Sequence, residues 1–260
     1  MTFTFSHVRQ TLLFTRQALL DPYRGSVLGV AWLYLQPLVL ILIYTLIFSG
    51  FMGGRLSGVN TPYAYSLYLV PGLLLWTAFA NTINSMASVY QGKAHIIRKI
   101  PVNLVILPSY IPFVEAVNFA VAMSIFGVFC IAIGHFPTVQ WLLLIPVCLG
   151  LILLAYAVGL ILACLSPFVP DLRPMTGIVL QLLFWLTPII YVPEILPARA
   201  AALLAYHPVY WGIRQAQNIV LYGTPASHNQ LILQVLLGLV LLYLAARIVK
   251  SLEKEIRDLL

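Results

Sequence analysis

Long apolar stretches without charge divide this chain into segments of membrane-crossing length. No Asp, Glu, Lys or Arg lies between Arg24 and Arg55, Arg55 and Lys93, Glu115 and Asp171, Arg173 and Glu194, or Arg214 and Arg247. A helix that crosses a bilayer needs about 20 predominantly apolar residues, whereas the strands of a membrane barrel alternate apolar and polar residues, a pattern absent here. The pattern therefore predicts an all-α integral membrane protein with six transmembrane helices, at roughly 27–50, 66–88, 108–133, 140–164, 174–192 and 230–248.

Composition supports a protein that lies in lipid. Hydrophobic residues make up 62% of the chain and charged residues 8%, whereas a soluble domain carries about 25% charged residues. The polar surface is therefore too small to cover a globule in water. Cys130, Cys148 and Cys164 all fall within predicted spans. Because they are odd in number and buried, we interpret them as packing residues and not as a disulfide framework.

The basic residues indicate an orientation, because loops rich in Lys and Arg stay in the cytoplasm. With both termini cytoplasmic, eleven of the fourteen Lys and Arg lie on that side, and only Arg55, Arg199 and Arg214 lie outside. Topology and anionic lipid head groups therefore explain the net charge of +7. No soluble domain is left over that would bind nucleic acid.

Residues 3–20 have the pattern of an amphipathic helix. Apolar residues fall on one stripe, and Arg9 and Arg16 fall off that stripe. The segment is too short and too polar to span a bilayer, so we expect an N-terminal helix lying in the cytoplasmic interface. Pro22 and Gly25 then break the helix before the first span begins.

A short basic segment, QGKAHIIRKIP at residues 91–101, occupies the cytoplasmic loop between the second and third spans. It holds three of the fourteen Lys and Arg within seven residues. As a short helix it has two sides, one with Ile96, Ile97 and Ile100 and the other largely with His95, Arg98 and Lys99. An amphipathic basic helix suits a groove on a partner protein. The alternative is a lipid-facing basic loop that only fixes topology.

On the outer side, residues 194–222 are moderately polar. Their second half predicts a helix that starts after Pro208 and ends at Gly223. This helix is too polar to cross the bilayer alone. We therefore expect outer re-entrant or gate helices between the fifth and sixth spans, which dip into the outer leaflet or pack over the spans.

The chain offers little for catalysis. Three of its seven acidic residues lie in the final ten residues, and the others stand singly, without paired carboxylates or metal-ligand spacing. The Gly92-Lys93 pair is no phosphate loop, because Ala94 stands where Ser or Thr is needed and Ala87 where Gly is needed. The sequence predicts no catalytic residue, no metal site and no cofactor bound by this chain.

Glu115 is the one acidic residue inside a predicted span. Carboxylates at membrane depth are costly and often functional, as proton relays or as linings of a pathway. Glu115 lies about two turns inside the cytoplasmic end, where water or an Arg side chain can reach it. Because a relay normally shows a chain of ionisable groups, a structural partner role is favoured over a relay.

Polar and aromatic residues gather near one face of two spans. Trp32, Gln36 and Tyr44 do so on the first span, and Gln181, Trp185 and Pro188 on the fifth. Such faces can line a sugar path, because the C–H groups of a pyranose stack on aromatic rings. The plainer interpretation is an interfacial aromatic belt with ordinary packing. More aromatic residues cluster at the outer end, namely Tyr63, Tyr65, Tyr68, Tyr191, Tyr206, Tyr210, Trp211 and Tyr222.

Small residues on the fourth span form a ridge that permits close helix approach, namely Ala155, Gly159 and Ala163. The ridge serves packing, and the spacing alone leaves open whether it packs within the chain or across a dimer.

Several stretches, taken in order, resemble the membrane permease subunits of polysaccharide-exporting ABC transporters, which export O-antigen, capsule and teichoic-acid precursors. They are YRGSVLGVAW with QPL (residues 23–32 and 36–38), AHIIRKIP with ILP (94–101 and 106–108), DLR with LFWLTPIIY (171–173 and 183–191), and HPVYW with VLYG (207–211 and 220–223). Together they cover nearly the whole chain in the family's order. One departure is ALLDPY at residues 18–23, which is poorer in basic residues than the family's pattern.

The resemblance implies an assembly of two copies of this chain with two copies of an ABC ATP-binding subunit, which alone binds ATP and Mg. The basic loop is then the coupling helix that docks on that subunit, through His95, Ile96, Ile97, Arg98 and Lys99. It also implies a channel along the dimer interface, lined mainly by the first and fifth spans. Its glycan path consists of Trp32, Gln36, Tyr44, Gln181, Phe184, Trp185 and Tyr191.

The implied substrate is a polysaccharide on an undecaprenyl-pyrophosphate lipid in the bacterial cytoplasmic (inner) membrane. Arg16 and Arg24 are candidates to meet the pyrophosphate where the substrate enters, through charge-assisted hydrogen bonds. Anchoring by positive charge on the inner side is their alternative role.

Three other functions compete with this interpretation. The nearest is a type-two ABC permease for a small lipid or drug, which the aromatic faces of the first and fifth spans would distinguish. An integral membrane enzyme of glycolipid synthesis is disfavoured by the scarcity of carboxylates. A purely structural membrane subunit would need no open path through a dimer.

Overall fold

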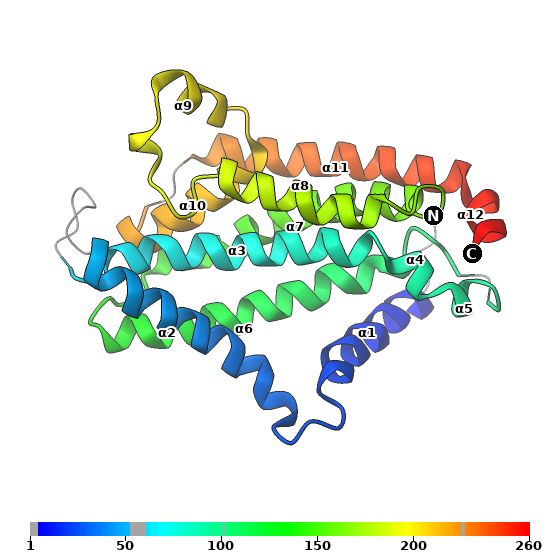
Figure 1. Ribbon diagram of the computed structural model, residues 1–260, viewed down its shortest axis with the longest axis horizontal. Coiled ribbons are helices and arrows are strands. Elements are labelled where there is room, and N and C mark those ends of the chain that lie inside the picture. The colour runs from blue at the N-terminus through cyan, green and yellow to red at the C-terminus, as the bar shows by residue number, and fades with distance from the viewer. Residues whose placement is uncertain (1–4, 53–60, 101, 225–226) are drawn as a thin grey trace.

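The structure is a computed structural model that describes residues 5–52, 61–100, 102–224 and 227–260. Within these ranges every regular element is a helix (Figure 1), which confirms the all-α prediction. The predicted interface helix 3–20 corresponds to α1 (Phe5–Leu20). Short 3-10 turns join the longer helices, namely η1 (Asp21–Tyr23), η2 (Gly29–Ala31), η3 (Leu107–Ser109), η4 (Val139–Leu143) and η5 (Pro193–Ile195).

Five helical segments in the described part of the chain are long and apolar enough to cross a membrane. They are Gly29–Ile47, Ala64–Met86, Leu107–Ala132, Val139–Leu165 and His228–Ser251. Their α-helices are α2 (Trp32–Met52), α3 (Ala64–Met86), α6 (Tyr110–Ala132), α7 (Leu144–Leu165) and α11 (His228–Ser251). These helices correspond to the first, second, third, fourth and sixth predicted spans.

The fifth predicted span, 174–192, is wrong at its outer end. The apolar helix α8 (Leu172–Leu186) has 15 residues, and the chain becomes extended at Thr187, where φ is −94° and ψ is 127°. Pro188 follows, and a residue that precedes proline is pushed out of the helical region by steric contact with the proline ring. α8 is therefore shorter than the five membrane-length helices.

α3 lies at the centre of the bundle, and most of its side chains are buried. It packs against α7, α10 (Pro208–Tyr222), α6, α2 and α8, while α11 packs against α7. Figure 1 shows α3, α8 and α11 running along the longest axis of the molecule, whereas α2 crosses it obliquely. In water, burial of apolar surface stabilises helix association by about 25 cal/mol per Å². Within lipid, close packing between helices stabilises their association instead.

The small residues of α7 allow a close contact with α3. Ala155, Gly159 and Ala163 are buried within the chain. A Cβ atom added to Gly159 would lie 2.8 Å from the Met86 sulfur and 2.9 Å from its Cβ. The ridge predicted from the sequence therefore packs inside one protomer at Gly159.

α1 packs against α6 with a partly polar face. The Thr11 and Ser109 hydroxyls are hydrogen-bonded at 3.0 Å, Thr15 is buried, and the Phe14 ring lies 5.9 Å from the Tyr110 ring. Leu12 and Leu13, from the apolar stripe predicted for the interface, are 60% and 56% exposed. Their exposure leaves apolar surface of α1 available to lipid, as an interface helix requires.

The helix predicted between Pro208 and Gly223 is confirmed as α10. Its first turn is capped by His207, whose Nδ1 accepts a hydrogen bond from the Tyr210 N–H at 3.1 Å. Burial lowers the pKa of His207, which favours the neutral ring that a cap acceptor requires. Gly223 ends the helix in the left-handed conformation, with φ of 66°. α10 packs against the spans α3, α7 and α11 and is therefore part of the bundle.

Four short helices mark the two ends of the bundle. α4 (Val89–Gly92), α5 (Ala94–Ile97) and α12 (Glu253–Leu259) lie at one end, which we call the basic end (Figure 1). α9 (Ala198–Leu204) lies at the opposite end. Arg214 of α10 pairs with Glu194, just before α9, at 3.1 Å.

Candidate functional site

The predicted coupling segment has a buried side and an exposed side, divided differently from the prediction. Ile97 is only 3% exposed and belongs to a cluster with Tyr90, Ile256 and Leu260. Ile96 is half-buried, and Ile100 is 54% exposed. The structure thus places Ile97 against its own chain, where it is not accessible to a partner.

The exposed side of this segment is basic. His95, Arg98 and Lys99 are all exposed, next to the apolar Ile100. Lys93 points elsewhere, because its Nζ lies 5.5 Å from the Phe14 ring centre and 5.7 Å from that of Tyr110. These cation–π contacts join the coupling segment to α1 and α6.

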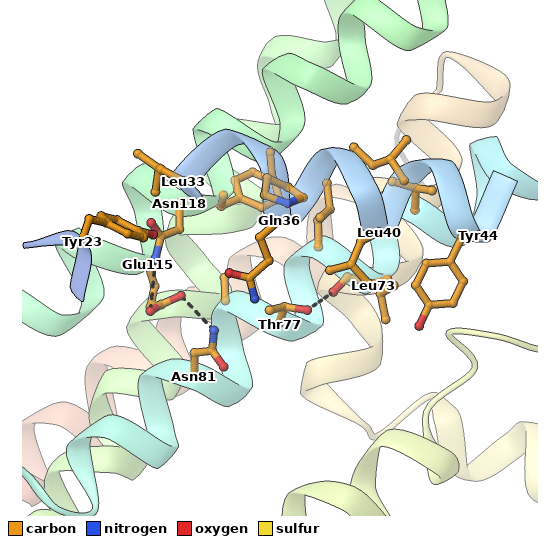
Figure 2. Close-up of a pocket in the computed structure, with 17 residues that line it drawn as sticks. Tyr23, Leu33, Gln36, Leu40, Tyr44, Leu73, Thr77, Asn81, Glu115 and Asn118 are labelled. Atoms are coloured by element: carbon orange, nitrogen blue, oxygen red, sulfur yellow. Dashed lines mark hydrogen bonds between the residues drawn. The ribbon is translucent and has the colours of Figure 1, made fainter. Parts of the chain in front are cut away.

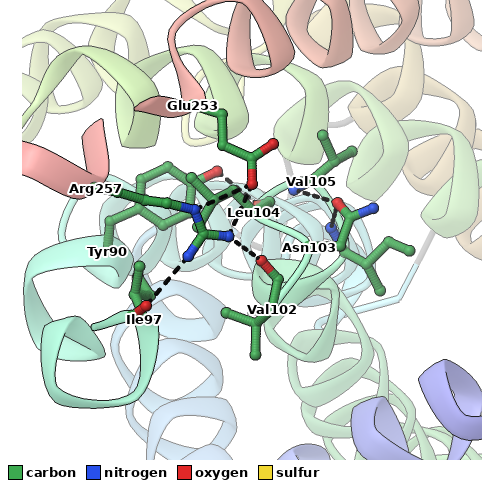
Figure 3. Close-up of polar contacts among 9 residues, drawn as sticks. Tyr90, Ile97, Val102, Asn103, Leu104, Val105, Glu253 and Arg257 are labelled. Atoms are coloured by element: carbon green, nitrogen blue, oxygen red, sulfur yellow. Dashed lines mark hydrogen bonds and ion pairs between the residues drawn. The ribbon is translucent and has the colours of Figure 1, made fainter. Parts of the chain in front are cut away.

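Arg257 of α12 fastens the segment to the C-terminal helix (Figure 3). Its guanidinium donates to the Ile97 carbonyl at 3.1 Å and to the Val102 carbonyl at 2.5 Å. Glu253 accepts from the same guanidinium at 2.8 Å and orients it. We call this set of contacts the Arg257 clamp. Charged hydrogen bonds of this kind contribute about 1.5–3 kcal/mol each before solvent screening.

Four further hydrogen bonds join the segment to the chain that follows it and to α7 and α8. Tyr90 donates to the Leu104 carbonyl at 2.7 Å, and Tyr156 of α7 donates to the Val105 carbonyl at 2.5 Å. Gln91 donates to the Ser166 carbonyl at 3.1 Å and accepts from Arg173 of α8 at 3.0 Å. Gln91 and Arg173 thus hydrogen-bond the segment to the start of α8.

Some of the residues predicted for the glycan path are exposed, and others are half-buried. On α2, Trp32 and Gln36 are exposed, and Tyr44 is half-buried. On α8, Gln181 and Trp185 are exposed, whereas Phe184 is half-buried with its ring 5.6 Å from that of Trp76. Both helices pack on α3 and keep broad apolar faces uncovered.

The chain after α8 is held by the aromatic residues of α3. Tyr68 donates to the Tyr191 carbonyl at 2.9 Å, Tyr65 donates to the Ile190 carbonyl, and Gln217 donates to the Pro188 carbonyl at 3.3 Å. The outer tyrosine cluster predicted from the sequence is thus partly structural, because Tyr65 and Tyr68 are buried. Tyr191 itself donates to the Trp185 carbonyl at 3.1 Å.

A cavity of about 150 Å³ lies among α2, α3 and α6 (Figure 2). Glu115, which is 8% exposed, accepts hydrogen bonds from the Asn81 and Asn118 amides at 3.4 Å each. Gln36 and Thr77 face the same space. The sequence singled out Glu115 and Gln36 but did not connect them, because the helices that carry them meet only in the fold.

Arg16 and Arg24 are the residues predicted to meet the lipid pyrophosphate. Both are exposed, Arg16 on α1 and Arg24 directly after η1. Arg24 pairs with Asp21 at 3.0 Å. Since this pair is exposed, solvent screening keeps it weak, at about 0–1 kcal/mol. Arg24 can therefore exchange Asp21 for another anion at small cost.

Among the described residues, no group of three or more His, Cys, Asp or Glu is placed to hold a metal ion. The three cysteines are free and buried. The groups available for function are thus hydrogen-bonding side chains, aromatic faces and surface charges.

Comparison with known proteins decides the class. The sequence profile of the ABC-2 type transporter family matches residues 9–221, which include the coupling segment, α2, α8 and the cavity. The chain belongs to the ABC-2 type transporter family. It is thus a multi-pass membrane permease of an ABC transporter, a transport subunit whose family implies an ATP-binding partner.

Curated relatives of this ABC-2 chain bear the name O-antigen export system permease protein RfbA. One from Klebsiella pneumoniae is 24% identical over 250 residues, covering 96% of this chain and 94% of the relative. A second from the same species is 23% identical over the same shares. One from Myxococcus xanthus is 26% identical over 238 residues, covering 91% of this chain and 89% of the relative.

Proposed function

We propose that this chain is the channel-forming permease subunit of an ABC exporter that moves a polysaccharide on an undecaprenyl-pyrophosphate lipid across the bacterial cytoplasmic membrane. The observation that carries the proposal is the similarity to O-antigen export permeases along 96% of the chain. Energy would come from ATP hydrolysis in a separate subunit. Two permease copies would assemble with two ATP-binding subunits.

The exposed side of the coupling segment is the proposed contact with the ATP-binding subunit. Arg98, Lys99 and Ile100 are exposed there. On the opposite side, buried Ile97 and the Arg257 clamp attach the segment to the rest of the chain. A rigid backing is what a docking helix needs if it is to transmit force. The hydrogen bond between Gln91 and Arg173 supports a route from this segment to α8.

α2 and α8 are the proposed walls of the glycan path. Their exposed Trp32 and Trp185 offer flat apolar surfaces that a sugar ring can stack on. Both helices leave α3 on one side and keep their other faces uncovered, which suits a channel that a second copy completes. A permease for a small lipid or drug remains the second candidate. Trp185→Ala should impair glycan export and leave the assembly intact if the path is for glycan.

The first test is purification of this chain from its native membrane under mild detergent, with mass spectrometry of the proteins retained. We expect a stoichiometric P-loop ATPase to be recovered with the unmodified chain. The double variant Arg98→Glu with Ile100→Asp should lose most of that ATPase, because both changes fall on the exposed side. The matched control is Lys250→Glu, because Lys250 is an exposed basic residue of α11. This variant should retain the ATPase.

Ile97→Asp serves as a second comparison, because it puts a charge into the cluster behind the segment. That variant should reduce the amount of folded protein in the membrane, an effect separable from ATPase loss at normal abundance. Full ATPase recovery with the Arg98→Glu and Ile100→Asp variant would overturn the docking assignment. Absence of any ATPase from the unmodified chain would overturn the exporter.

A further inference from the structure

The cavity among α2, α3 and α6 combines a buried carboxylate with apolar walls. Glu115 lies within the membrane-length segment Leu107–Ala132, where an ionisable side chain is expensive and marks a functional position by default. Leu33, Leu40, Leu73 and Phe119 surround the polar groups. A site of this kind, mostly apolar with a few convergent polar atoms, is the usual form of a small-ligand pocket.

Acceptor positions on Glu115 and Asn118 lack hydrogen-bond partners inside the cavity. Each Glu115 oxygen receives one amide hydrogen at the long distance of 3.4 Å, although a carboxylate has about four lone-pair positions. The Asn118 Oδ1 is buried and has no hydrogen-bond partner. The amide of Gln36 makes no hydrogen bond to the described chain and lies on the same cavity. A buried acceptor without a partner costs about 1–3 kcal/mol, so this arrangement favours a ligand that donates.

The charged residues of the cavity restrict the class of ligand further. Neither Lys nor Arg is among the residues that line the cavity, and its one ionisable acid is Glu115. A phosphate placed there would meet the carboxylate without a compensating cation. Aromatic residues stand at the two ends, Tyr23 near Glu115 and Tyr44 farther along α2 (Figure 2). An uncharged ring with several hydroxyl groups satisfies the acceptors and stacks on such faces.

We infer that this cavity binds an uncharged, hydroxyl-bearing group, and that Glu115 and Asn118 are its principal acceptors. Its volume of about 150 Å³ leaves room for a bulky group, because a single water needs only about 10–15 Å³ of such space. Resting on the proposed function, the group is the lipid-proximal sugar of the exported glycan. Arg24 follows the cavity-lining Tyr23 in the sequence and would meet the phosphate next to that sugar. The polyol head group of an ordinary lipid offers the same chemistry and is the other source.

The test measures lipid retention by the purified full-length chain with native mass spectrometry in detergent, without ATP. The probes are undecaprenyl pyrophosphate carrying one hexose, bare undecaprenyl pyrophosphate, and phosphatidylglycerol. The unmodified chain should retain the hexose-bearing lipid about tenfold more than the bare lipid, the effect of one charge-assisted hydrogen bond. Glu115→Gln and Asn118→Leu should each bring this ratio close to one.

Asn84→Leu is the matched control, since Asn84 is an exposed amide three residues after Asn81 on α3 and does not line the cavity. It should leave the ratio unchanged. Equal retention of both undecaprenyl lipids by the unmodified chain, with no displacement by phosphatidylglycerol, would overturn the inference. Displacement by phosphatidylglycerol that depends on Glu115 would keep the polyol chemistry and assign it to a membrane lipid.

This measurement is independent of export. If deletion of the chain left glycan export intact in cells, the proposed function would fail, while a hexose-dependent ratio lost in Glu115→Gln would still establish the cavity as a polyol site. If export depended on the chain but the ratio were one throughout, only the cavity inference would fail.

Discussion

Gly159 illustrates how one absent side chain determines a helix contact. α7 approaches α3 so closely there that a Cβ atom would fall within 2.9 Å of Met86 atoms. Gly177 of α8 has nothing within 4 Å of the corresponding position. The two glycines look alike in an apolar sequence, and only the fold separates them.

We predict that Gly159→Leu lowers the stability of the protein markedly, while Gly177→Leu does not. Overpacking a close contact costs about 1–3 kcal/mol, and here the neighbouring atoms include the Cβ of Met86, which cannot rotate away. Thermal unfolding in detergent, followed by the loss of monodisperse protein, would measure the difference. Adding Met86→Ala to Gly159→Ala should restore part of the lost stability. Equal melting of both leucine variants would contradict the packing assignment.

At the scale of elements, the coupling segment depends on a helix distant in sequence. The Arg257 clamp joins α12 to backbone carbonyls on either side of residues 98–101. Ile97 is the last residue of α5, where helix carbonyls lack an internal partner, and the guanidinium supplies one. α12 thereby sets the position of the proposed docking surface.

We predict that Arg257→Gln loosens residues 93–105 without unfolding the bundle. Glutamine cannot reach both carbonyls and lacks the charge, so amide hydrogen exchange in this segment should accelerate by about tenfold, the equivalent of one charged hydrogen bond. Lys254→Gln, on the exposed side of α12, is the control. Unchanged exchange in the Arg257 variant would show that the apolar cluster around Ile97 holds the segment alone.

The elements themselves were largely predictable, because charge-free length and proline positions specify membrane helices directly. The sequence located α10 from Pro208 and Gly223, and it located the basic loop from three clustered charges. It misplaced the end of α8, since LFWLTPIIY is apolar throughout and hydropathy does not register the turn at Thr187. It also could not assign Ile97 to the interior, because Ile96, Ile97 and Ile100 share one side of a short helix and only tertiary contacts distinguish them.

The cavity around Glu115 was predictable only in part. A single carboxylic acid within a membrane span can be singled out from the sequence, because burying its charge there costs free energy. Asn118 is three residues after Glu115 on α6, a spacing visible in the sequence, whereas Asn81 and Gln36 lie on α3 and α2 and no local spacing connects them to Glu115. Arg257 was likewise missed, since a basic residue near a terminus gives no sign of the backbone carbonyls it will meet.

At the scale of the whole molecule, the charges predict which end faces the cytoplasm. Lys93, Arg98 and Lys99 flank α5 at the basic end, Lys254 and Arg257 lie on α12 at the same end, and α9 lies at the opposite end (Figure 1). We predict that a cysteine placed at Arg199 reacts with a membrane-impermeant maleimide in intact spheroplasts, and that one placed at Lys254 reacts only after lysis. Both positions are exposed, and the three native cysteines are buried, which keeps background labelling low. Labelling of position 254 before lysis would reverse the orientation.

The early end of α8 has a consequence for the barrier itself. Its 15 residues extend about 22 Å at about 1.5 Å per residue, while the hydrocarbon core of a bilayer is about 30 Å thick. The remaining depth is filled by the non-helical chain from Thr187 to Tyr191, whose carbonyls at Pro188, Ile190 and Tyr191 are taken by side chains of α3 and α10. The irregular backbone after α8 therefore has its polar groups satisfied inside the protein, as non-helical chain at membrane depth requires. The length of α8 is thus set by α3 and α10, because their side chains hold the chain at the point where the helix stops.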